Sequence, residues 1–374
     1  MNETVLHTRR DSRNRVITLW TILLSGFFVC NSIRADDPYT VTETDSEITI
    51  DTPQLQAKIQ KRGYVSGIAG GSLLDKKTGF LDIGFGLDIV DWIMEPGSDA
   101  AYRDQLPKEM IYEFNNSYHG KGQKRSIEGP QICTQAKELK PTIIRGTDFV
   151  AIQQSYQYRT AAPGKKTGST WTQTIVFPIG KRYFFSSDRI DAVNASDAMF
   201  LRIDMPGHIK HSGGDTFSQV YLSYPTNKID PNDPGVPVDI PTKAIGQGQI
   251  VPSSAFAQNF APDAAFNYRR SENSIPTRII RGYQTRNPKY GSDGPWLAGL
   301  TLDPSVVSEA WCHQRGYICM IQEFGGRPIR PGQSFSAAFA TGFFDSIEEM
   351  HTLYDSLKGN NQLTVNESGW KLGN

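Results

Sequence analysis

Apolar and polar residues alternate with a period of two along much of this chain of 374 residues. Such alternation, together with β-branched and aromatic residues, is typical of strands that bury one face. Strands are predicted over residues 55–61, 150–158, 169–177, 183–185 and 199–203. Residues 161–168 are rich in turn formers, so 150–177 is predicted to form a hairpin.

One helix is predicted close to the C-terminus. Its apolar face consists of Ile347, Met350, Leu353, Tyr354 and Leu357. We expect Asp345 to be its N-cap, because Glu348 follows three residues later, and Gly359 to end it.

Several long segments carry prolines, glycines and polar residues and are predicted to be irregular. These segments are 93–108, 119–141, 205–217, 225–249 and 284–296. No internal repeat or linker divides the chain. We therefore expect one domain over residues 36–374 that is mostly β, a large two-sheet antiparallel β-sandwich with one C-terminal helix.

Residues 1–35 have the three parts of a secretory signal peptide. A basic region ends at Arg15, an apolar core of 15 residues spans Val16–Cys30, and a polar exit ends at Ala35. An uncleaved anchor would have a similar pattern, but this core is short for a membrane span. We expect a secreted or periplasmic protein without a membrane partner after cleavage.

The charge of the mature chain argues against a nucleic-acid partner. Cleavage after Ala35 removes five of the 39 Lys and Arg and two of the 39 Asp and Glu, which leaves 34 against 37. No basic stripe remains, and nucleic-acid binding depends on one.

The densest group of reactive side chains lies in residues 309–323, which are predicted to form a hairpin that turns at Arg315-Gly316. Cys312 would then lie opposite Cys319 at a separation that a disulfide can span. Two small core side chains would give the same sequence. Cys133 is expected to be a free thiol.

The same register would group Glu309, Trp311 and His313 on one face with Ile318, Met320 and Gln322. An indole, an imidazole and a carboxylate on one face suit a sugar site, and a core with satisfied polar groups would look alike.

His208 and His211 lie in residues 204–215, which are predicted to be a loop that follows a strand. They are candidates for a general base or a substrate contact, and a plain surface loop is the alternative. Two histidines at this spacing indicate a metal site only weakly, so no metal is assigned. No cofactor is expected, although Asp230–Asp233 offers oxygen ligands for calcium without the usual loop pattern.

Trp92 stands among Asp88, Asp91 and Glu95, a mixture that suits either a sugar site or a buried strand. Paired carboxylates such as these would serve glycoside hydrolysis if two of them were close together. Arg278, Arg281 and Arg315 could hold a uronate carboxylate or form surface ion pairs.

Residues 48–59, 63–67 and 74–79, with Arg182–Asp191 and Phe335–Phe343, resemble strands and turns of galactose-mutarotase-like β-supersandwiches. The resemblance spans most of residues 45–345 and includes no catalytic motif. It implies a sandwich of the kind found in aldose epimerases and polysaccharide lyases. The paired histidines and carboxylate of the epimerases do not map onto positions of this sequence, which puts simple mutarotation in doubt.

Export favours work on glycans outside the cytoplasm. Our first hypothesis is a polysaccharide lyase that cleaves a uronate-containing glycan by β-elimination. His208, His211 or His313 would be the base, and Tyr221 or Tyr224 the acid. Substrate binding would involve Trp92, Arg278, Arg281, Glu309, Trp311 and Arg315.

Two alternatives remain open. A sugar epimerase or glycoside hydrolase would use Glu309 or Glu323, and a non-catalytic carbohydrate-binding protein would need no such group. Each has a polysaccharide or oligosaccharide as its partner. No glycine-rich loop joins a strand to a helix, which disfavours redox and phosphoryl chemistry.

Overall fold

The computed structural model describes residues 38–98, 105–111, 124–210, 216–226, 243–256, 266–271, 275–287, 289–314 and 316–374. For Glu109, His313 and Gln314 it describes the backbone alone. Asp36–Asn374 form one compact unit. The predicted signal peptide, His211, Arg315 and the possible calcium ligands Asp230–Asp233 lie outside the described residues.

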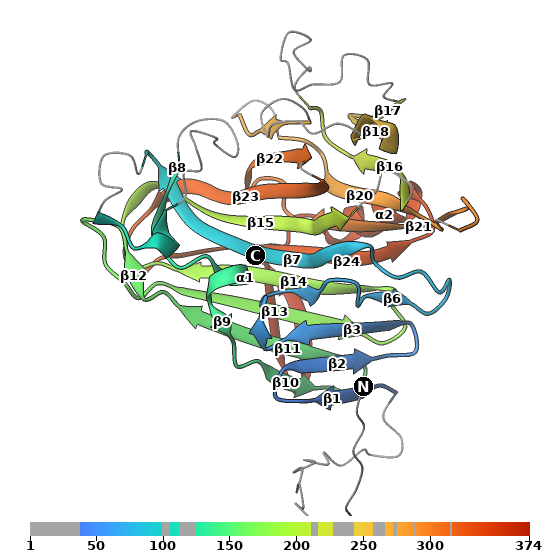
Figure 1. Ribbon diagram of the computed structural model, residues 1–374, viewed down its shortest axis with the longest axis horizontal. Coiled ribbons are helices and arrows are strands. Elements are labelled where there is room, and N and C mark those ends of the chain that lie inside the picture. Colours follow the sequence, from blue (N-terminus) through green and yellow to red (C-terminus); the bar gives the residue numbers. More distant parts are fainter. Residues whose placement is uncertain are drawn as a thin grey trace, which may run out of the picture. The chain divides into compact units, whose positions relative to one another are not determined.

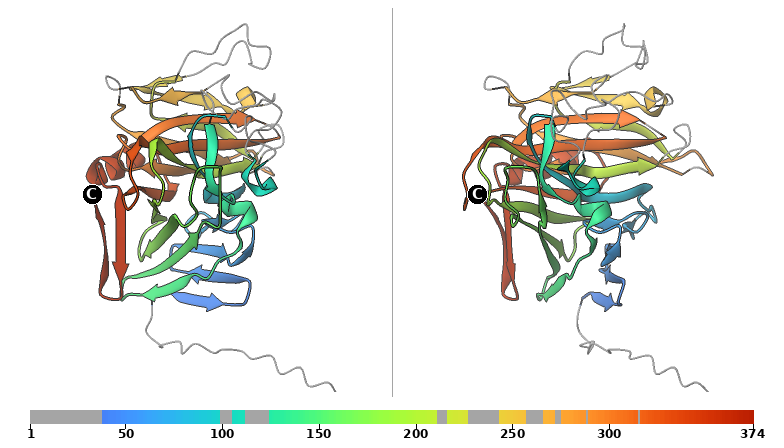
Figure 2. Two further views of the ribbon diagram at one scale, coloured as in Figure 1. Left: turned by 90° about the vertical axis from the view of Figure 1, so that its left-hand side faces the viewer. Right: turned by 60° about the vertical axis from the view of Figure 1, so that its left-hand side comes forward.

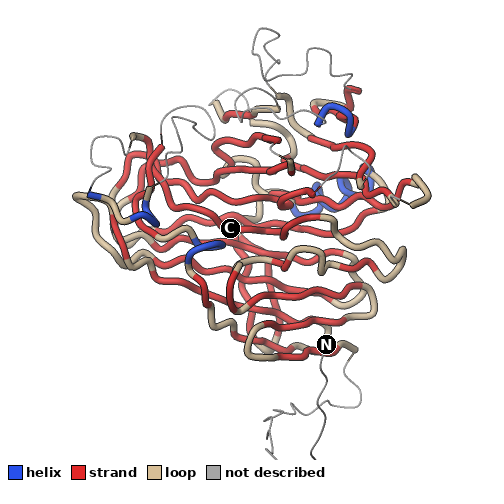
Figure 3. Tube along the Cα trace, in the orientation of Figure 1, coloured by secondary structure: helices blue, strands red, loops and turns tan. Residues whose placement is uncertain are grey.

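Strands make up most of the described chain (Figure 3), and the largest antiparallel sheet has ten of them (Figure 1). In spatial order they are β10 (Thr142–Arg145), β11 (Phe149–Gln157), β13 (Thr170–Pro178), β14 (Tyr183–Asp191), β24 (Ser334–Phe344), β21 (Asp293–Thr301), β20 (Ile279–Arg286), β16 (Phe217–Leu222), β18 (Gly248–Pro252) and β17 (Lys243–Ile245). The predicted hairpin over 150–177 is confirmed, because β11 pairs with β13.

The second large sheet has eight strands and is also antiparallel. Its order is β12 (Thr160–Ala161), β8 (Lys124–Gly129), β7 (Gly84–Pro96), β15 (Ser196–Lys210), β23 (Tyr317–Ile329), β22 (Val307–Gln314) and β19 (Tyr268–Arg269), with β5 (Ile68–Ala69) also paired to β7. The predicted large antiparallel β-sandwich is thereby confirmed.

The remaining elements are small. A four-stranded sheet consists of β1 (Thr40–Glu43), β2 (Glu47–Asp51), β3 (Leu55–Gln60) and β6 (Leu74–Asp75). Two strand pairs are β4 (Arg62–Gly63) with β9 (Lys137–Glu138) and β25 (Gln362–Asn366) with β26 (Gly369–Gly373). The described helices are η2 (Lys108–Met110), α1 (Ile132–Gln135), η3 (Ser253–Phe256) and α2 (Ile347–Leu357). Among the described residues, no helix has the length and apolar character needed to cross a membrane.

Period-two burial explains how the layers stack. β3 alternates buried and half-buried residues from end to end, so it turns one side toward the ten-stranded sheet. The inner faces of the eight-stranded and four-stranded sheets bury their apolar side chains against the same sheet. Each fully buried aliphatic or aromatic side chain contributes about 1.5–3 kcal/mol.

The other face of the ten-stranded sheet is covered by α2 and by the β25–β26 hairpin (Figure 2). Trp370 packs its ring on Phe185, with 5.1 Å between the ring centroids. Both broad faces of this sheet are thus occupied by apolar packing. The cavity described below lies instead on the outer face of the eight-stranded sheet.

The predicted helix exists, but its cap is one residue later than expected. Ser346 is the N-cap and accepts a hydrogen bond from the backbone N–H of Glu349. The side chain of Glu349 accepts in turn from the backbone N–H of Asp345. A serine hydroxyl followed three residues later by glutamate satisfies the free N–H groups, so Asp345 is not needed as the cap.

All five segments predicted to be irregular contain strand residues: β7 reaches into 93–108, β17 lies within 225–249, and β20 and β21 reach into 284–296. β15 continues through residues 205–210, and residues 119–141 contain β8 and α1. Pro206 and Gly207 suggested a loop, but a strand can include both residues where it bulges. His208 therefore lies on a strand of the eight-stranded sheet.

The β22–β23 hairpin is one residue out of the predicted register. Cys312 pairs with Met320, and Cys319 with His313, so the turn has three residues instead of two. A one-residue slip turns every side chain of one strand to the other face. Cys312 and Cys319 consequently lie on opposite faces, and neither forms a disulfide.

A layer of buried polar groups lies between the two large sheets. Asp88 on β7 is fully buried beside Ser186 and Asp188. Asp188 on β14 is also fully buried and accepts a bond from Nε1 of Trp171. Burial raises the pKa of Asp88 to about 6. Burial and the nearby Asp88 raise the pKa of Asp188 well above its usual value.

We predict that Asp88→Asn stabilises the protein increasingly as the pH rises from about 4 to about 7. A carboxyl whose folded pKa is raised binds its proton more tightly when folded, so its cost grows above the unfolded pKa. A shift to about 6 from 3.8 corresponds to roughly 3 kcal/mol at most. Urea unfolding at several pH values measures the difference. Asp197→Asn, at an exposed site, is the control. A difference in the free energy of unfolding that does not change with pH would contradict the raised pKa of Asp88.

Candidate functional site

A bulge in β15 brings together the two side chains at the centre of the site. Asp204 pairs with Ile321 on β23, and His208 pairs with Cys319. Four steps along β15 thus match two steps along its neighbour. Nε2 of His208 lies 2.9 Å from Oδ2 of Asp204. In a regular strand without a bulge, residues four steps apart are separated by about 13 Å.

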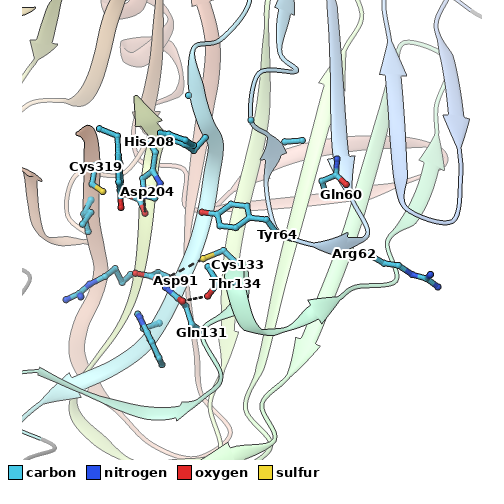
Figure 4. A pocket seen from close by; sticks show the side chains of 18 residues that line it. Gln60, Arg62, Tyr64, Asp91, Gln131, Cys133, Thr134, Asp204, His208 and Cys319 are labelled. Atoms are coloured by element: carbon cyan, nitrogen blue, oxygen red, sulfur yellow. Dashed lines mark hydrogen bonds and ion pairs between the residues drawn. The ribbon is translucent and has the colours of Figure 1, made fainter. Parts of the chain in front are cut away.

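The bulge faces a cavity of about 800 Å³ on the outer side of the eight-stranded sheet. The side chains that line it come from β3, β4, β5, β7, α1, β15 and β23 and from the segments beside them (Figure 4). They are Gln60, Arg62, Tyr64, Ala69, Gly70, Gly84, Phe85, Asp91, Trp92, Gln131, Cys133, Thr134, Arg202, Asp204, His208, Tyr317, Cys319 and Ile321.

One wall of the cavity consists of the β15 and β23 side chains. The side chain of His208 keeps 18% of its surface exposed, while Asp204 and Cys319 are almost fully buried. The Tyr317 ring packs against the imidazole at 5.3 Å. Burial alone would lower the pKa of His208, but its attraction to Asp204 and the hydrogen bond between them raise it above the ordinary value.

A second polar cluster lines the cavity and is formed by Tyr64, Asp91, Gln131, Cys133 and Thr134; Asp91 comes from β7, the strand that pairs with β15 (Figure 4). Nε2 of Gln131 donates to Oδ1 of Asp91, and the Thr134 hydroxyl donates to the amide oxygen of Gln131. These side chains are held in place because α1 buries Ile132 and Cys133 in the core.

Two ionisable groups of this cluster have shifted pKa values. Burial raises the pKa of Asp91 to about 6, with a further contribution from the negative charge of Asp204. Desolvation, followed by the charges of Cys133 and Asp204, raises the pKa of Tyr64. The Tyr64 side chain is 37% exposed, but its hydroxyl end points toward His208 and Asp204 (Figure 4). The cavity therefore presents both proton donors and proton acceptors.

A buried network of charges lies beside the cavity on the same face of the sheet. The Lys124 ammonium is paired with both Glu309 and Glu323, and Nε of Arg202 donates to Oε1 of Glu323 at 3.0 Å. Lys124 and Arg202 each lie about 5 Å from the centre of the Trp311 ring. Burial would raise the pKa of Glu323, but Lys124 and Arg202 lower it below its usual value.

This network accounts for three residues that the sequence suggested as functional. Glu309 and Glu323 are held by cations, and neither lines the cavity, so neither is placed as a free acid or base. Trp311 is fully buried beneath the two cations instead of facing a sugar. Trp92, in contrast, does line the cavity, although it is also largely buried.

The remaining predicted residues are dispersed. Tyr224 is fully buried in the core, and the hydroxyl of Tyr221 lies 2.6 Å from Nε2 of His351 on α2. Arg278 pairs with Asp355 of the same helix. Arg281 is buried and donates to the backbone oxygens of Ile321 and Trp311. None of these described side chains lines the cavity with His208.

Sequence reasoning missed Asp204 and Tyr64 as site residues and named Asp91 only as one of several carboxylates near Trp92. Asp204 stands four residues before His208, a spacing that carries no meaning on a regular strand. Proline and glycine between them were the available sign of a bulge. Nothing in the spacing of Tyr64, Asp91 and Cys133 indicates that they meet.

No protein-family model matches the chain, and no curated protein matches it. Solved structures are similar in fold. A galactose mutarotase-like protein from Lactobacillus casei is 11% identical with a TM-score of 0.41, and the match covers 80% of this chain and all of that one.

Two further similar structures come from Lactobacillus acidophilus. For a galactose 1-epimerase the identity is 9%, the TM-score 0.38 and the coverage 82% of this chain and 98% of the other. A galactose mutarotase related enzyme is 11% identical with a TM-score of 0.35, and the match covers 81% of this chain and 99% of that one. At such identities and TM-scores the likeness concerns the fold, and the reaction has to follow from the side chains.

We predict that Glu323→Gln lowers the free energy of unfolding by about 3 kcal/mol, because it leaves two buried cations with one carboxylate. Chemical denaturation measures this loss. Glu138→Gln is the matched control, since Glu138 forms an exposed pair with Arg62 and its loss is expected to cost less than about 1 kcal/mol. Equal losses in the two variants would show that the network does not hold the sheet.

Proposed function

We propose that this protein is a carbohydrate-active enzyme of the epimerase type, which interconverts forms of a sugar by proton transfer in the cavity. The observation that carries the proposal is the pairing of His208 with Asp204 on β15 and the location of Asp91 in the same cavity on the neighbouring strand β7. One group that gives a proton and another that takes one, both lining one cavity, are what ring opening and reclosure of a sugar need.

The lining of the cavity supports a sugar as the ligand. Phe85 and Tyr317 form an edge-to-face pair at 5.3 Å, and Phe85 is 44% exposed. Aromatic rings pack on the C–H faces of sugars, while amide, hydroxyl and carboxyl groups bind their hydroxyls. Gln60, Gln131 and Thr134 supply such polar groups.

The cations of the cavity favour a neutral sugar over a uronate. Among the described lining residues, Arg62 and Arg202 are the cationic ones apart from His208. Arg202 is bound to Glu323, and Arg62 is largely exposed beside Glu138. A uronate carboxylate would therefore lack a well-placed cation on this part of the surface.

The two pKa shifts assign the roles. With a pKa of about 6, Asp91 is ionised at neutral pH and is a stronger base than an ordinary carboxylate. His208, whose pKa is raised, is the acid. Asp91 would accept the proton of the anomeric hydroxyl while His208 gives a proton to the ring oxygen. The C1–O5 bond then breaks as the C1=O1 bond forms, and the reverse steps close the ring on the other face.

We predict that His208→Gln and Asp91→Asn each lower kcat/KM for the favoured aldose by about 10²- to 10⁴-fold, the usual contribution of general acid–base catalysis. The rate of anomer exchange is measured by polarimetry or NMR on a panel of neutral aldoses. His351→Gln is the control, because His351 lies on α2 beside Tyr221 and does not line the cavity. Wild-type rates in both cavity variants would exclude the proposed roles.

The pH profile of kcat/KM should be bell-shaped. The acidic limb should fall below about pH 6, where Asp91 becomes protonated, and the alkaline limb should fall above the raised pKa of His208. Asp204→Asn removes the charge that raises the His208 pKa, so the alkaline limb should move to lower pH while the acidic limb persists. An unmoved alkaline limb would remove His208 as the titrating acid.

A lyase remains a second candidate because the Tyr64 hydroxyl end points toward His208. A tyrosine and a histidine can together transfer the protons of a β-elimination. Incubation with uronate polymers distinguishes the two reactions, since only the lyase creates an unsaturated product that absorbs in the ultraviolet. That product, formed by the wild type and lost in Tyr64→Phe, would replace the epimerase proposal.

A further inference from the structure

The first wall of the cavity contains a cluster of three metal-ligating side chains. Oxygen of Asp204, ring nitrogen of His208 and Sγ of Cys319 all lie within 4.8 Å of one another. The β15 bulge places His208 directly opposite Cys319 across the ladder. We propose that Asp204, His208 and Cys319 bind a thiophilic divalent cation of the Zn²⁺ class at the floor of the cavity.

The spacing of the three ligand atoms suits one small ion. Zn²⁺ binds sulfur at about 2.3 Å and nitrogen or oxygen at about 2.0–2.2 Å, so tetrahedral ligands stand roughly 3.3–3.8 Å apart. The 2.9 Å between His208 and Asp204 would open by a few tenths of an ångström as the ion replaces their shared proton. Rotation of the Cys319 side chain can bring its Sγ within bonding distance of the ion.

The donor types select the metal. A thiolate and an imidazole favour Zn²⁺ and related ions, whereas Mg²⁺ and Ca²⁺ require oxygen ligands. The charges also balance, since one thiolate and one carboxylate neutralise a divalent ion. Arg202 does not upset this balance, because its guanidinium is paired with Glu323.

A second observation points to a ligand at the same place. Asp204 is almost fully buried and lines the cavity, yet its Oδ1 accepts no hydrogen bond from the described part of the chain. A buried carboxylate oxygen without a donor is costly, and a cation at the floor of the cavity would satisfy it. The exposed part of His208 leaves the fourth position of a tetrahedral ion open to the cavity.

Occupation by a metal has a consequence for catalysis, and this part rests on the proposed function. A histidine that binds the ion through one ring nitrogen is held in its neutral form, so it is no longer the imidazolium acid that gives a proton to the sugar. Zn²⁺ should therefore inhibit proton transfer reversibly, and a chelator should restore it. Binding of the metal itself does not depend on which reaction the cavity performs.

The chain offers two matched cysteine controls. Cys133 lines the same cavity but is not part of the three-ligand cluster. Cys312 lies in the same hairpin as Cys319 but on the core face of the sheet. None of the three forms a disulfide, so each can be exchanged for serine by itself.

Titration of the metal-free protein with Co²⁺ tests the site by absorption spectroscopy. We expect a thiolate-to-cobalt band in the near ultraviolet and tetrahedral visible bands, both displaced by Zn²⁺ and unaffected by Mg²⁺ or Ca²⁺. Cys319→Ser should abolish the near-ultraviolet band, and Asp204→Asn should weaken binding at least tenfold. Cys133→Ser and Cys312→Ser should keep the band. No band, or a band that survives in Cys319→Ser, overturns the proposal.

A measurement on the wild type tests the site even if the Cys319→Ser variant fails to fold. Zn²⁺ should protect Cys319 from alkylation at least tenfold, as mapped by mass spectrometry, while the reaction of Cys133 stays within twofold. Equal protection of both thiols would mean general closure of the cavity and would contradict the site. Binding without inhibition would count against the proposed acid–base role of His208 and leave the metal site standing.

Discussion

The described site depends on the mismatch in length between β15 and its neighbours. With two extra residues between them, Asp204 and His208 are in direct contact, whereas residues four steps apart on a regular strand are separated by about 13 Å. The mismatch is tolerated because Gly207 has no Cβ, which at that position would collide with the carbonyl oxygen of Gly86 on β7. The contact of His208 with Asp204, the raised pKa of His208 and the proposed cation site all follow from this local arrangement of backbone.

Compensation of buried charge is the second constraint, and the two large sheets meet it in different ways. On the outer face of the eight-stranded sheet, cations and carboxylates neutralise one another around Trp311. Between the sheets, Asp88 and Asp188 have no cation beside them in the described part of the chain, and burial keeps a proton on the pair. The first arrangement favours ionised groups and the second favours neutral ones, although both use carboxylates on neighbouring strands.

The sequence was informative where burial repeats with a fixed period. Alternation located β3, β11, β13 and β14 and therefore the antiparallel sandwich. The sequence was not informative where a shift of one residue decides how two strands pair. The register of β22 and β23 differs by one residue from the predicted one, and this places Cys319, one half of a possible disulfide, on the cavity wall. Tyr64, Asp91 and His208 come from separate strands and segments, so their meeting depends on tertiary packing that local patterns do not encode.

The order of strands has a consequence for synthesis of the chain. β24, from residues 334–344, lies between β14 and β21 in the middle of the ten-stranded sheet, and β23 pairs with β15 in the other. Neither sheet can close until these late residues have left the ribosome. Contacts between such distant parts of a sequence form slowly, because a long loop must be ordered first. During synthesis, each large sheet therefore lacks one of its inner strands until the last part of the chain has been made.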